Sequence, residues 1–405
     1  MQIPVSAEVT IERILPGGLG LAHAEGLTLF VALAAPGDVV RVRIDRLRGK
    51  VAFASIEQII KPSPVRVEPP CPYFGACGGC DFQQLGYQAQ LDAKIEMIRD
   101  CLRRIAQIDN LPQISIHAAP KQWQYRVRAN WQLVPATKWL GYFEAGSHRV
   151  CDVEVCAVLD PRLQEILRRV RSEIREGTVS NIPKDIRAVI GDGTGPDSAS
   201  VAPPLAGFET NEVSLSIAGE SYSFTADSFF QTNPDLLEAL IEEAIGNAKG
   251  KLAIDLYSGA GLFTLPLARR FERVIGIESN ARAAAFALGN LQRAHLQNAE
   301  VVTSGVAQWL KEHSHSFESV DFLLLDPPRA GAENLVIKGI LELQPRRISY
   351  VSCDPATLAR DFKKLLAGGY SLDSVQAFDL FPQTHHVETV VHLVRTDDES
   401  RRTPR

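Results

Sequence analysis

Hydrophobic residues follow two different periods along the chain, and the change of period divides the chain into parts. In the N-terminal part, short runs of β-branched and alternating residues are separated by glycine and proline turns, without helical spacing between them. These runs are Val9–Ile14, Leu29–Leu33 and Val39–Ile44. They predict a small antiparallel β-barrel over residues 1–60.

Beyond Leu252 the period changes, and strand-like runs alternate with segments of helical spacing. The strand-like runs are Ala253–Leu256, Val274–Glu278, Glu300–Thr303, Val320–Asp326, Ile348–Ser352 and, last, Thr389–Val394. This alternation predicts a mainly parallel, doubly wound sheet of the Rossmann-like kind. We expect this domain to span residues 221–396, and we expect the polar residues 397–405 to form a disordered tail.

The segment between these parts, residues 61–220, mixes both periods and predicts an α+β central domain. Apolar residues on one face predict an amphipathic helix over residues 87–106, which we expect to pack on the C-terminal domain. Strands and one further helix near residues 161–174 fill most of the rest. Residues 177–205 are rich in Gly, Ser and Pro and predict a loop or an exposed hairpin.

One run of the central domain, Lys121–Trp131, interleaves aromatic and basic residues at strand spacing. Such a run can stack nucleic-acid bases and neutralise phosphates. It can equally be a half-buried strand whose aromatic side chains face a core. The pattern leaves both interpretations open.

Length and charge limit the class of protein further. The 405 residues exceed the roughly 250 to 300 at which one core stops growing, so two or three domains are expected. With 43 basic and 48 acidic side chains, a polyanion must be met by a local basic patch, such as the five cations between Arg41 and Lys50. No apolar run reaches the ~18 residues of a membrane span, and no signal sequence opens the chain. We therefore expect a soluble, cytoplasmic monomer without a membrane partner.

Seven cysteines, an odd number, favour thiols, metal ligands or catalysis over disulfides. Three of them lie within ten residues, and the glycines between them let the backbone fold around an ion: Cys71, Cys77 and Cys80. A closed site needs a fourth ligand, and we choose Cys156 over Cys101 and Cys151. Zinc and iron-sulfur clusters both suit such thiolates, so the residues alone leave the occupant open.

Glycines also follow the first strand of the C-terminal domain, where Gly259 and Gly261 let a ligand lie against the backbone at a helix N-terminus. A dinucleotide fold would carry a third glycine, but Thr264 stands at that position. Glu278 ends the next strand, where a carboxylate can accept both hydroxyls of a ribose. These residues favour an adenosine without a diphosphate, which S-adenosylmethionine fits better than NAD.

Reactive side chains end the later strands of the same sheet. Asp326 follows the fourth strand and Cys353 the fifth, so both should lie on the rim where α/β sheets bind ligands. Glu388 begins the last strand, and Phe229–Pro234 opens a helix that we expect to lead into the site. A lone cysteine at a strand end is more often a small buried hydrophobe. The carboxylates that converge on Cys353 favour a catalytic thiol instead.

Successive motifs of the C-terminal domain resemble those of the RNA (uracil-5)-methyltransferases, which use S-adenosylmethionine. These motifs are Phe229–Asn233, Asp255–Gly261, Leu325–Arg329, Val351–Asp361 and Phe381–Glu388. The N-terminal strand order and its Ala35–Asp38 turn resemble a TRAM domain, an OB-like barrel of RNA-modifying enzymes. The barrel and the cysteines together are similar to the 23S ribosomal RNA branch, which carries a [4Fe-4S] cluster.

The resemblance implies a role for individual residues. Cys353 would be the nucleophile and Glu388 the base, while Phe229 would stack on the substrate base. The implied cofactor contacts, with the two glycines above, are Gln231, Tyr257, Glu278 and Asp326. The implied ligands of the [4Fe-4S] cluster, with zinc as the alternative occupant, are Cys71, Cys77, Cys80 and Cys156. Two positions depart from the family pattern, because Leu262 stands where Asn is common and Gly305 where an acidic residue or Asn often faces adenine.

We therefore expect methyl transfer to C5 of a uridine, through a covalent bond between Cys353 and C6. The combination of barrel and cluster favours 23S ribosomal RNA, although archaeal-type transfer RNA enzymes combine them too. The alternatives are an NAD-dependent dehydrogenase and a non-catalytic RNA-binding protein. A DNA cytosine-5 methyltransferase would carry its cysteine after a proline at the fourth strand, where Asp326 stands.

Overall fold

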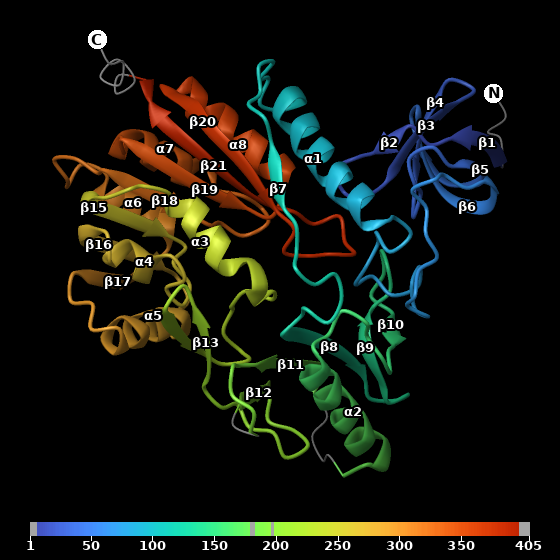
Figure 1. Ribbon diagram of the computed structural model, residues 1–405, viewed down its shortest axis with the longest axis horizontal. Coiled ribbons are helices and arrows are strands. Elements are labelled where there is room, and N and C mark those ends of the chain that lie inside the picture. Colours follow the sequence, from blue (N-terminus) through green and yellow to red (C-terminus); the bar gives the residue numbers. More distant parts are fainter. Residues whose placement is uncertain (1–5, 179–182, 196–197, 397–405) are drawn as a thin grey trace.

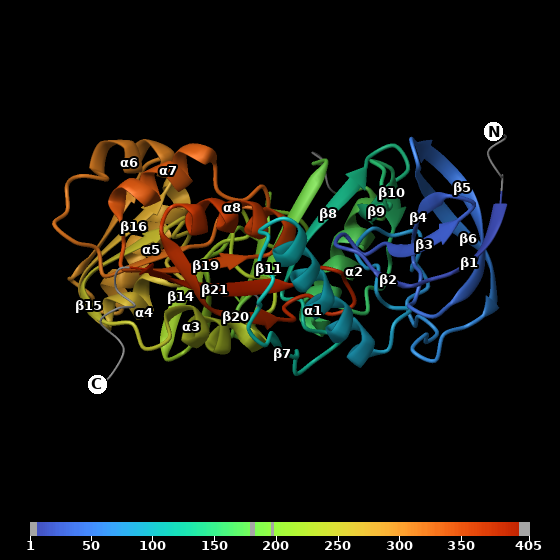
Figure 2. The same cartoon turned by 90° about the horizontal axis from the view of Figure 1, so that it is seen from above.

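The computed structural model describes residues 6–178, 183–195 and 198–396, and the tail predicted at 397–405 lies outside these ranges. The chain forms a small barrel, a central α+β region and a large C-terminal sheet with helices on both faces (Figure 1). The barrel and the large sheet lie at opposite ends of the molecule, with the helix α1 (Tyr87–Arg104) between them (Figure 2). None of the helices in the described ranges combines the length and apolarity needed to cross a membrane.

Six strands build the N-terminal barrel in the order β1-β5-β6-β4-β3-β2. They are β1 (Ser6–Thr10), β2 (Arg13–Ile14), β3 (Gly20–Ala24), β4 (Leu27–Val31), β5 (Val39–Arg48) and β6 (Val51–Lys61). The prediction of a purely antiparallel barrel was wrong in one pair, because β6 runs parallel to β4. β6 folds back on β5 through a tight turn, which restores the direction of β4 and lets the two strands pair.

The central region contains a five-stranded sheet in the order β10-β9-β8-β11-β12, with α2 (Pro161–Glu176) on one face. Its strands are β8 (Arg128–Val134), β9 (Trp139–Phe143), β10 (Val150–Asp152), β11 (Asp185–Ile190) and β12 (Ala199–Ala202). Asp160 caps α2 and Gly177, in the left-handed region, ends it, which is why the helix spans these residues. The segment predicted as a loop or exposed hairpin instead supplies β11 and β12, whose residues are largely buried. The hairpin β13 (Val213–Ile217) and β14 (Glu220–Phe224) leads on to the C-terminal sheet.

The C-terminal sheet has eight strands in the order β17-β16-β15-β18-β19-β21-β20-β7. They are β15 (Gly250–Leu256), β16 (Phe271–Glu278), β17 (Ala299–Thr303), β18 (Phe322–Leu325), β19 (Arg347–Ser352), β20 (Tyr370–Phe378), β21 (Glu388–Arg395) and β7 (Ser115–His117). The first five in this order are parallel, whereas β21 is antiparallel to both of its neighbours. The pattern thus predicted the parallel part correctly, and it missed β20 and the edge strand β7.

Alternate residues of the buried strands point into two separate cores, one on each face of this sheet. Leu324 packs into the first core, while Leu323 and Leu325 pack into the second. The first face carries α3 (Leu237–Ile245), α4 (Thr264–Ala268) and α5 (Ala281–Arg293). The second carries α6 (Val306–His313), α7 (Asn334–Leu343) and α8 (Pro355–Ala367), and α1 packs there against α8. The helix α1 and the strand β7, which precede the C-terminal domain in the sequence, therefore complete its layers.

Candidate active site

The carboxyl ends of four parallel strands bring the predicted site residues to one rim. Tyr257 to Gly261 follow β15, and Glu278 ends β16. Asp326 follows β18 and Cys353 follows β19, which lies directly beside it. The order β16-β15-β18-β19 therefore places the predicted cofactor residues next to the predicted nucleophile, where ligands of open α/β sheets bind.

Strand register brings Glu388 to the nucleophile although the two residues are far apart in the sequence. β21 runs antiparallel to β19, and Ser352 stands opposite Thr389 in the ladder. Cys353 is the residue after Ser352, and Glu388 is the residue before Thr389. The thiol and the carboxylate therefore lie across from each other where this strand pair ends.

The electrostatic surroundings of this pair keep its groups protonated. Burial raises the pKa of the Cys353 thiol to about 12, and the nearby Glu388 and Asp326 carboxylates contribute to the rise. Burial and the Asp326 charge also raise the pKa of Glu388 well above its ordinary value. Glu388 is 2% exposed, and its Oε1 has no hydrogen-bond partner within the described part of the chain. Such a carboxyl group tends to hold its proton, and it becomes a strong base once that proton is lost.

Arg329 supplies positive charge to the same rim, and the predicted list of site residues did not include it. Its charge lowers the pKa of both Cys353 and Glu388, opposing the larger effect of burial. The residue stands in the motif Leu325–Arg329, so the motif could have revealed it. Arg329 is therefore the cation that can favour a thiolate at Cys353.

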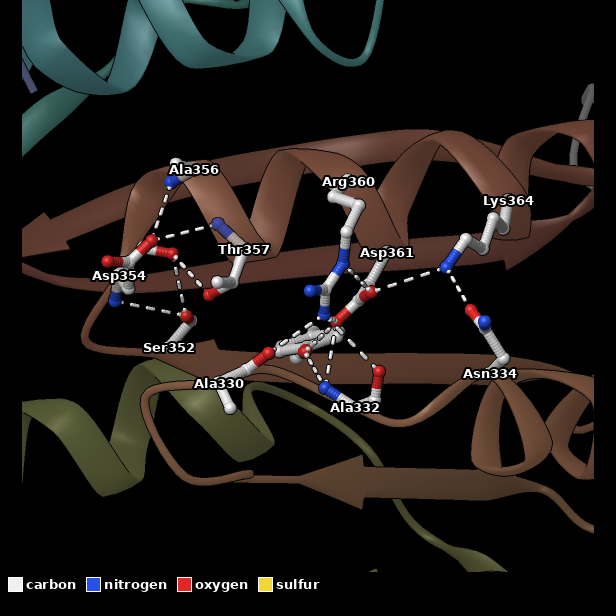
Figure 3. A network of polar contacts seen from close by, with 11 residues as sticks. Ala330, Ala332, Asn334, Ser352, Asp354, Ala356, Thr357, Arg360, Asp361 and Lys364 are labelled. Atoms are coloured by element: carbon white, nitrogen blue, oxygen red, sulfur yellow. Dashed lines mark hydrogen bonds and ion pairs between the residues drawn. The ribbon is translucent and has the colours of Figure 1, made fainter.

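The turn from β19 into α8 fixes the position of Cys353. Asp354 caps the helix by accepting hydrogen bonds from the backbone N–H groups of Ala356, at 2.9 Å, and Thr357, at 2.8 Å (Figure 3). Ser352 closes the turn from the other side, because its Oγ accepts from the N–H of Asp354 at 3.2 Å. The thiol is thus held on a rigid turn at the start of a helix.

Further along α8, the buried Asp361 anchors the loop that follows Arg329. Its carboxylate accepts a hydrogen bond from the N–H of Ala332 at 2.8 Å (Figure 3). It also accepts one from the hydroxyl of Tyr350 at 2.9 Å. A Cβ at Gly331 would lie 2.6 Å from the Asp361 Oδ2, so only glycine lets the loop approach so closely. This anchor holds the loop that follows Asp326 and Arg329 against α8, the helix that begins just after Cys353.

On the cofactor side of the rim, the carboxylate of Glu278 is hydrogen-bonded, unlike the Oε1 of Glu388 in the part of the chain that the structure describes. Each oxygen of Glu278 accepts a backbone N–H, from Gly259 at 2.9 Å and from Asn280 at 2.6 Å. Gly259 has a φ of +55° and no other atom within 4 Å of where a Cβ would lie, so a ligand can approach its backbone. Asp255 lies buried beneath, and burial raises its pKa to about 7. One of its oxygens accepts the hydroxyl of Thr264 at 2.6 Å.

Two positions that depart from the family pattern leave the fold of this side intact. Leu262 is buried, and its carbonyl accepts the hydroxyl of Tyr222 at 3.1 Å. Gly305 caps α6 with its backbone, and nothing lies within 4 Å of where its Cβ would be. The space beside Gly305 is therefore open to a ligand.

The segment Phe229–Asn233 reaches the same region from the first face of the sheet. Phe229 is 66% exposed, and Gln231 is buried. Asn233 caps the short helix η2 (Pro234–Leu236), and its Nδ2 donates to the carbonyl of Leu380 at 3.2 Å. This bond ties Asn233, four residues after the exposed Phe229, to the segment that leads into Glu388.

The predicted metal ligands gather at a separate place. Four thiols line one cavity of the central region together with Arg126: Cys71, Cys77, Cys80 and Cys156. Cys151 and Cys101 are not among the residues that line it, and the choice of Cys156 as the fourth ligand stays a prediction. Burial raises the pKa of Cys77 to about 11 and that of Cys80 to about 12.

The charge and burial of Arg126 bear on whether this cavity suits a metal cluster. Its Nε is buried and has no hydrogen-bond partner among the described residues, so it can stabilise an anionic group. The donor set of four soft thiols and a cation fits a thiolate-bound metal or an iron-sulfur cluster. Over the described ranges, no three His, Cys, Asp or Glu side chains form a ready-made metal site.

Two groups proposed as RNA contacts are less available than the sequence suggested. Trp131 and Tyr125 of the aromatic and basic run are buried, so the half-buried strand is the correct interpretation for these two rings. In the barrel patch, Arg41 pairs with Glu8 at 2.5 Å, and Arg43 pairs with Asp45 at 3.0 Å. The exposed cations Arg48 and Lys50 complete the patch.

Comparison with known proteins places these features in context. Residues 208–396 match the profile of the family described as tRNA (Uracil-5-)-methyltransferase, and residues 7–56 match the TRAM domain. The 23S rRNA (uracil(1939)-C(5))-methyltransferase of Pseudomonas putida is 32% identical over 430 residues, covering 96% of this chain and 94% of that protein. An RNA methyltransferase of Thermosynechococcus vestitus is 31% identical, covering 95% of this chain and 97% of its own.

A solved structure also matches over nearly the whole length. The tRNA (uracil-54, C5)-methyltransferase of Pyrococcus abyssi, in complex with S-adenosyl-L-homocysteine, superposes with a TM-score of 0.73 at 25% identity. The match covers 96% of this chain and 100% of that one. The barrel, the central region and the large sheet therefore have counterparts in one known protein.

Proposed function

The chain belongs to the RNA (uracil-5-)-methyltransferase family, and from this premise we propose that it methylates one uridine of 23S ribosomal RNA through a covalent bond between Cys353 and C6. The predicted family, the TRAM domain and the methyltransferase fold are confirmed. The dehydrogenase and the non-catalytic RNA-binding protein were wrong as alternatives. The observation that carries the proposal is the strand register that sets Glu388 opposite Cys353.

C5 of uracil is too weak a nucleophile to accept a methyl group unaided, so covalent activation is required. The Cys353 thiol loses its proton to solvent, the thiolate adds to C6, and the enolate formed in the ring makes C5 nucleophilic. C5 then takes the methyl group, which S-adenosylmethionine supplies when it is bound. Glu388 removes the proton from C5, and the electrons of the C5–H bond form the C5=C6 double bond as the Cys353–C6 bond breaks.

The charges on the rim suit these steps. A thiol with a pKa of about 12 is almost wholly protonated at neutral pH even with the Arg329 charge beside it, so the thiol has to lose its proton when the substrates bind. Arg329 is placed to stabilise the thiolate and then the negative charge that develops on the ring. The raised pKa of Glu388 strengthens that carboxylate as a base for the C5 proton.

The site binds its two substrates from opposite sides. On one side we propose that Gln231, Tyr257, Glu278 and Asp326 hold S-adenosylmethionine over the open backbone of Gly259 and Gly261. On the other, the exposed ring of Phe229 would stack on the flipped uracil, which is worth about 1 to 3 kcal/mol per base. That gain would offset most of the few kcal/mol needed to extrude a base from its stack.

The choice of 23S ribosomal RNA is supported by the relative in Pseudomonas putida, whose named activity is on that RNA. A transfer RNA uridine is the second candidate, because the structure that matches along the whole chain is a tRNA methyltransferase. The deciding experiment maps 5-methyluridine by mass spectrometry in ribosomal and transfer RNA from cells with and without this protein. Loss of one ribosomal site supports the proposal. Loss of a transfer RNA site alone replaces it with the second candidate.

We further propose that the four-thiol cavity holds a [4Fe-4S] cluster. The four thiols that line the cavity support it, and so does the buried Arg126 Nε, which has no hydrogen-bond partner among the described residues, since a thiolate-bound cluster carries negative charge. Protein purified without oxygen should contain iron and acid-labile sulfide, and Cys156→Ser should lose both. Cys151→Ser is the matched control, because Cys151 does not line the cavity, and it should retain them. Stoichiometric zinc in the unaltered protein would contradict the assignment.

For the domain boundaries we propose residues 60 and 220, with the central domain between them. The six-, five- and eight-stranded sheets support this division, although β7 joins the eight-stranded sheet and the β13–β14 hairpin spans residue 220. Limited proteolysis should cut first near these positions, and initial cuts within β15–β19 would argue against it.

A further inference from the structure

The chain that leads into Glu388 is held by residues from a distant part of the sequence. The segment Asp379–Val387 connects β20 to β21, and the backbone N–H groups of Asp81 and Phe82 donate to its Gln383 carbonyl at 3.1 and 3.0 Å. The hydroxyl of Tyr125 donates to the Pro382 carbonyl at 3.0 Å. The loop after the last cysteine of the cluster motif thus lies against the approach to Glu388.

The helix α1 holds the same segment from a second direction. Gln90 bonds Gln383 twice, accepting its backbone N–H at 2.9 Å and donating to its side-chain oxygen at 3.0 Å. Lys94 pairs with Asp379 and donates to the carbonyl of Phe381 at 3.1 Å. These side chains are buried, so their bonds are shielded from water and hold the segment firmly.

Asp81 makes the contact nearest to Glu388. One of its oxygens accepts the backbone N–H of His385 at 2.8 Å, and the other pairs with the His385 ring Nδ1. His385 stands three residues before Glu388, and Asp81 directly follows Cys80, which lines the thiol cavity. Two hydrogen bonds therefore connect the cysteine loop to the strand end that presents the base.

We propose that Asp81 is a positioning residue for Glu388, so that the cysteine loop of the central region orients the base of the C-terminal domain. This inference rests on the proposed covalent function. Within the described part of the chain, the hydrogen bonds of the Asp81 side chain go to His385, so its effect on the base would pass through that residue. Loss of the contact should therefore leave thiol addition and methyl transfer possible while it slows removal of the C5 proton.

Loss of the Asp81 contact should slow one step of the reaction, the release of the methylated RNA from Cys353. When the C5 proton stays in place, the Cys353–C6 bond cannot break, and methylated RNA remains attached to the protein. A displacement of the base by about 1 Å can slow such a step by roughly 100-fold. General loss of stability would instead lower addition, methyl transfer and release together.

The test compares Asp81→Ala and His385→Ala with the unaltered protein, using RNA from cells that lack it and S-adenosylmethionine tritiated in the methyl group. Label that stays with the protein after denaturation and ribonuclease digestion measures the adduct. We expect the adduct fraction to rise about tenfold or more and release to slow by about 10- to 100-fold. Asp81→Asn keeps an oxygen that can accept the His385 N–H, so it should give an intermediate adduct fraction.

Two further variants make the outcomes decisive. Asp38→Ala is the control, because it removes a buried carboxylate of the barrel that accepts from Arg66 and from the N–H of Ser63. Glu388→Gln is the positive control for trapping. If Glu388→Gln gives no adduct, the proposed chemistry fails. If it gives one but neither Asp81→Ala nor His385→Ala does, the positioning role is overturned. An equal adduct from Asp38→Ala would overturn it too.

Discussion

The two halves of the C-terminal rim are built on opposite electrostatic principles. On the cofactor side, both oxygens of Glu278 accept backbone N–H groups, and its partners lie within a short stretch of sequence. On the reaction side, Glu388 is buried with an oxygen that has no partner in the described ranges, beside Asp326 and a raised-pKa thiol. In the first half Glu278 is satisfied by backbone groups and suited to binding, although the buried Asp255 beneath it has one oxygen without a partner in the described ranges. The second stores unfavourable charge interactions that the reaction can relieve.

This contrast extends to what holds each half in place. The cofactor residues are held by their own β-α turns, within one domain. Glu388 is reached through a segment held by Asp81, Gln90 and Lys94, which belong to another part of the chain. The position of Glu278 thus depends on contacts within the C-terminal domain, whereas the position of Glu388 depends on contacts with residues from the central region. Four substitutions, ordered by their expected effect on turnover, test this contrast between the two halves.

Cys353→Ala should have the largest effect, because it removes the atom that activates the ring. We expect methylation to fall by at least about a thousandfold. Binding of S-adenosylmethionine, measured by calorimetry, should stay within about threefold of normal, since the cofactor half is built separately. Undiminished formation of 5-methyluridine would reject the nucleophile and, with it, the reaction half as described.

Glu388→Gln should come next. Loss of a general base typically costs about 10²- to 10⁴-fold in turnover, and the amide keeps the shape of the buried side chain. Here the loss should appear with a stable protein-RNA adduct that carries the methyl group, visible as a shifted band on a denaturing gel. Normal turnover without an adduct would show that another group removes the proton.

Arg329→Met should have a smaller effect, on the thiol itself. Without the cation the pKa of Cys353 should rise further, so less thiolate is present at any pH. We expect alkylation of Cys353 by iodoacetamide at pH 8.5, followed by peptide mass spectrometry, to slow by about 3- to 10-fold. Lys338→Met, an exposed cation on α7, is the control and should leave the rate unchanged. Equal rates in both variants would remove Arg329 from the reaction half.

Asp255→Asn should affect turnover least and stability most clearly. The folded protein keeps the Asp255 proton up to about pH 7, whereas the unfolded chain releases it near 3.8. The folded state therefore binds more protons between these values, and the free energy of unfolding falls as pH rises through this window. The amide cannot ionise, so the variant should be more stable than the parent at pH 8 by a few kcal/mol, ~4 at most, and similar at pH 4. Urea titration at the two pH values measures this difference. An equal difference at both would refute the raised pKa.

Much of the fold was predictable because local rules decide it. The five parallel strands were recognised from apolar runs that are buried on both faces, and α2 from its periodicity and its Asp-Pro start. β20 and β7 were missed because an edge pair is specified by its partner and not by its own pattern. β11 and β12 were missed because Gly, Ser and Pro residues around them suggested a loop.

Of the site, the chemistry was predictable and the arrangement only in part. Motif residues such as Cys353, Glu388 and the four cysteines stand out by type and spacing. Arg329 was in a quoted motif, yet its role became visible only from the groups that surround it. The contact of Asp81 with His385 had no sequence signal, because nothing in either neighbourhood points to the other.

Most of the secondary-structure elements, most of the proposed site residues and the family were predictable from the sequence alone. These properties follow from the period of apolar residues and from short motifs, both of which act over a few neighbouring positions. Only the tertiary structure decided that a thiol and a carboxylate face each other across β19 and β21, and that a loop of the central region holds the carboxylate. Strand register and domain docking depend on the sum of many distant contacts, and no single stretch of sequence contains that sum.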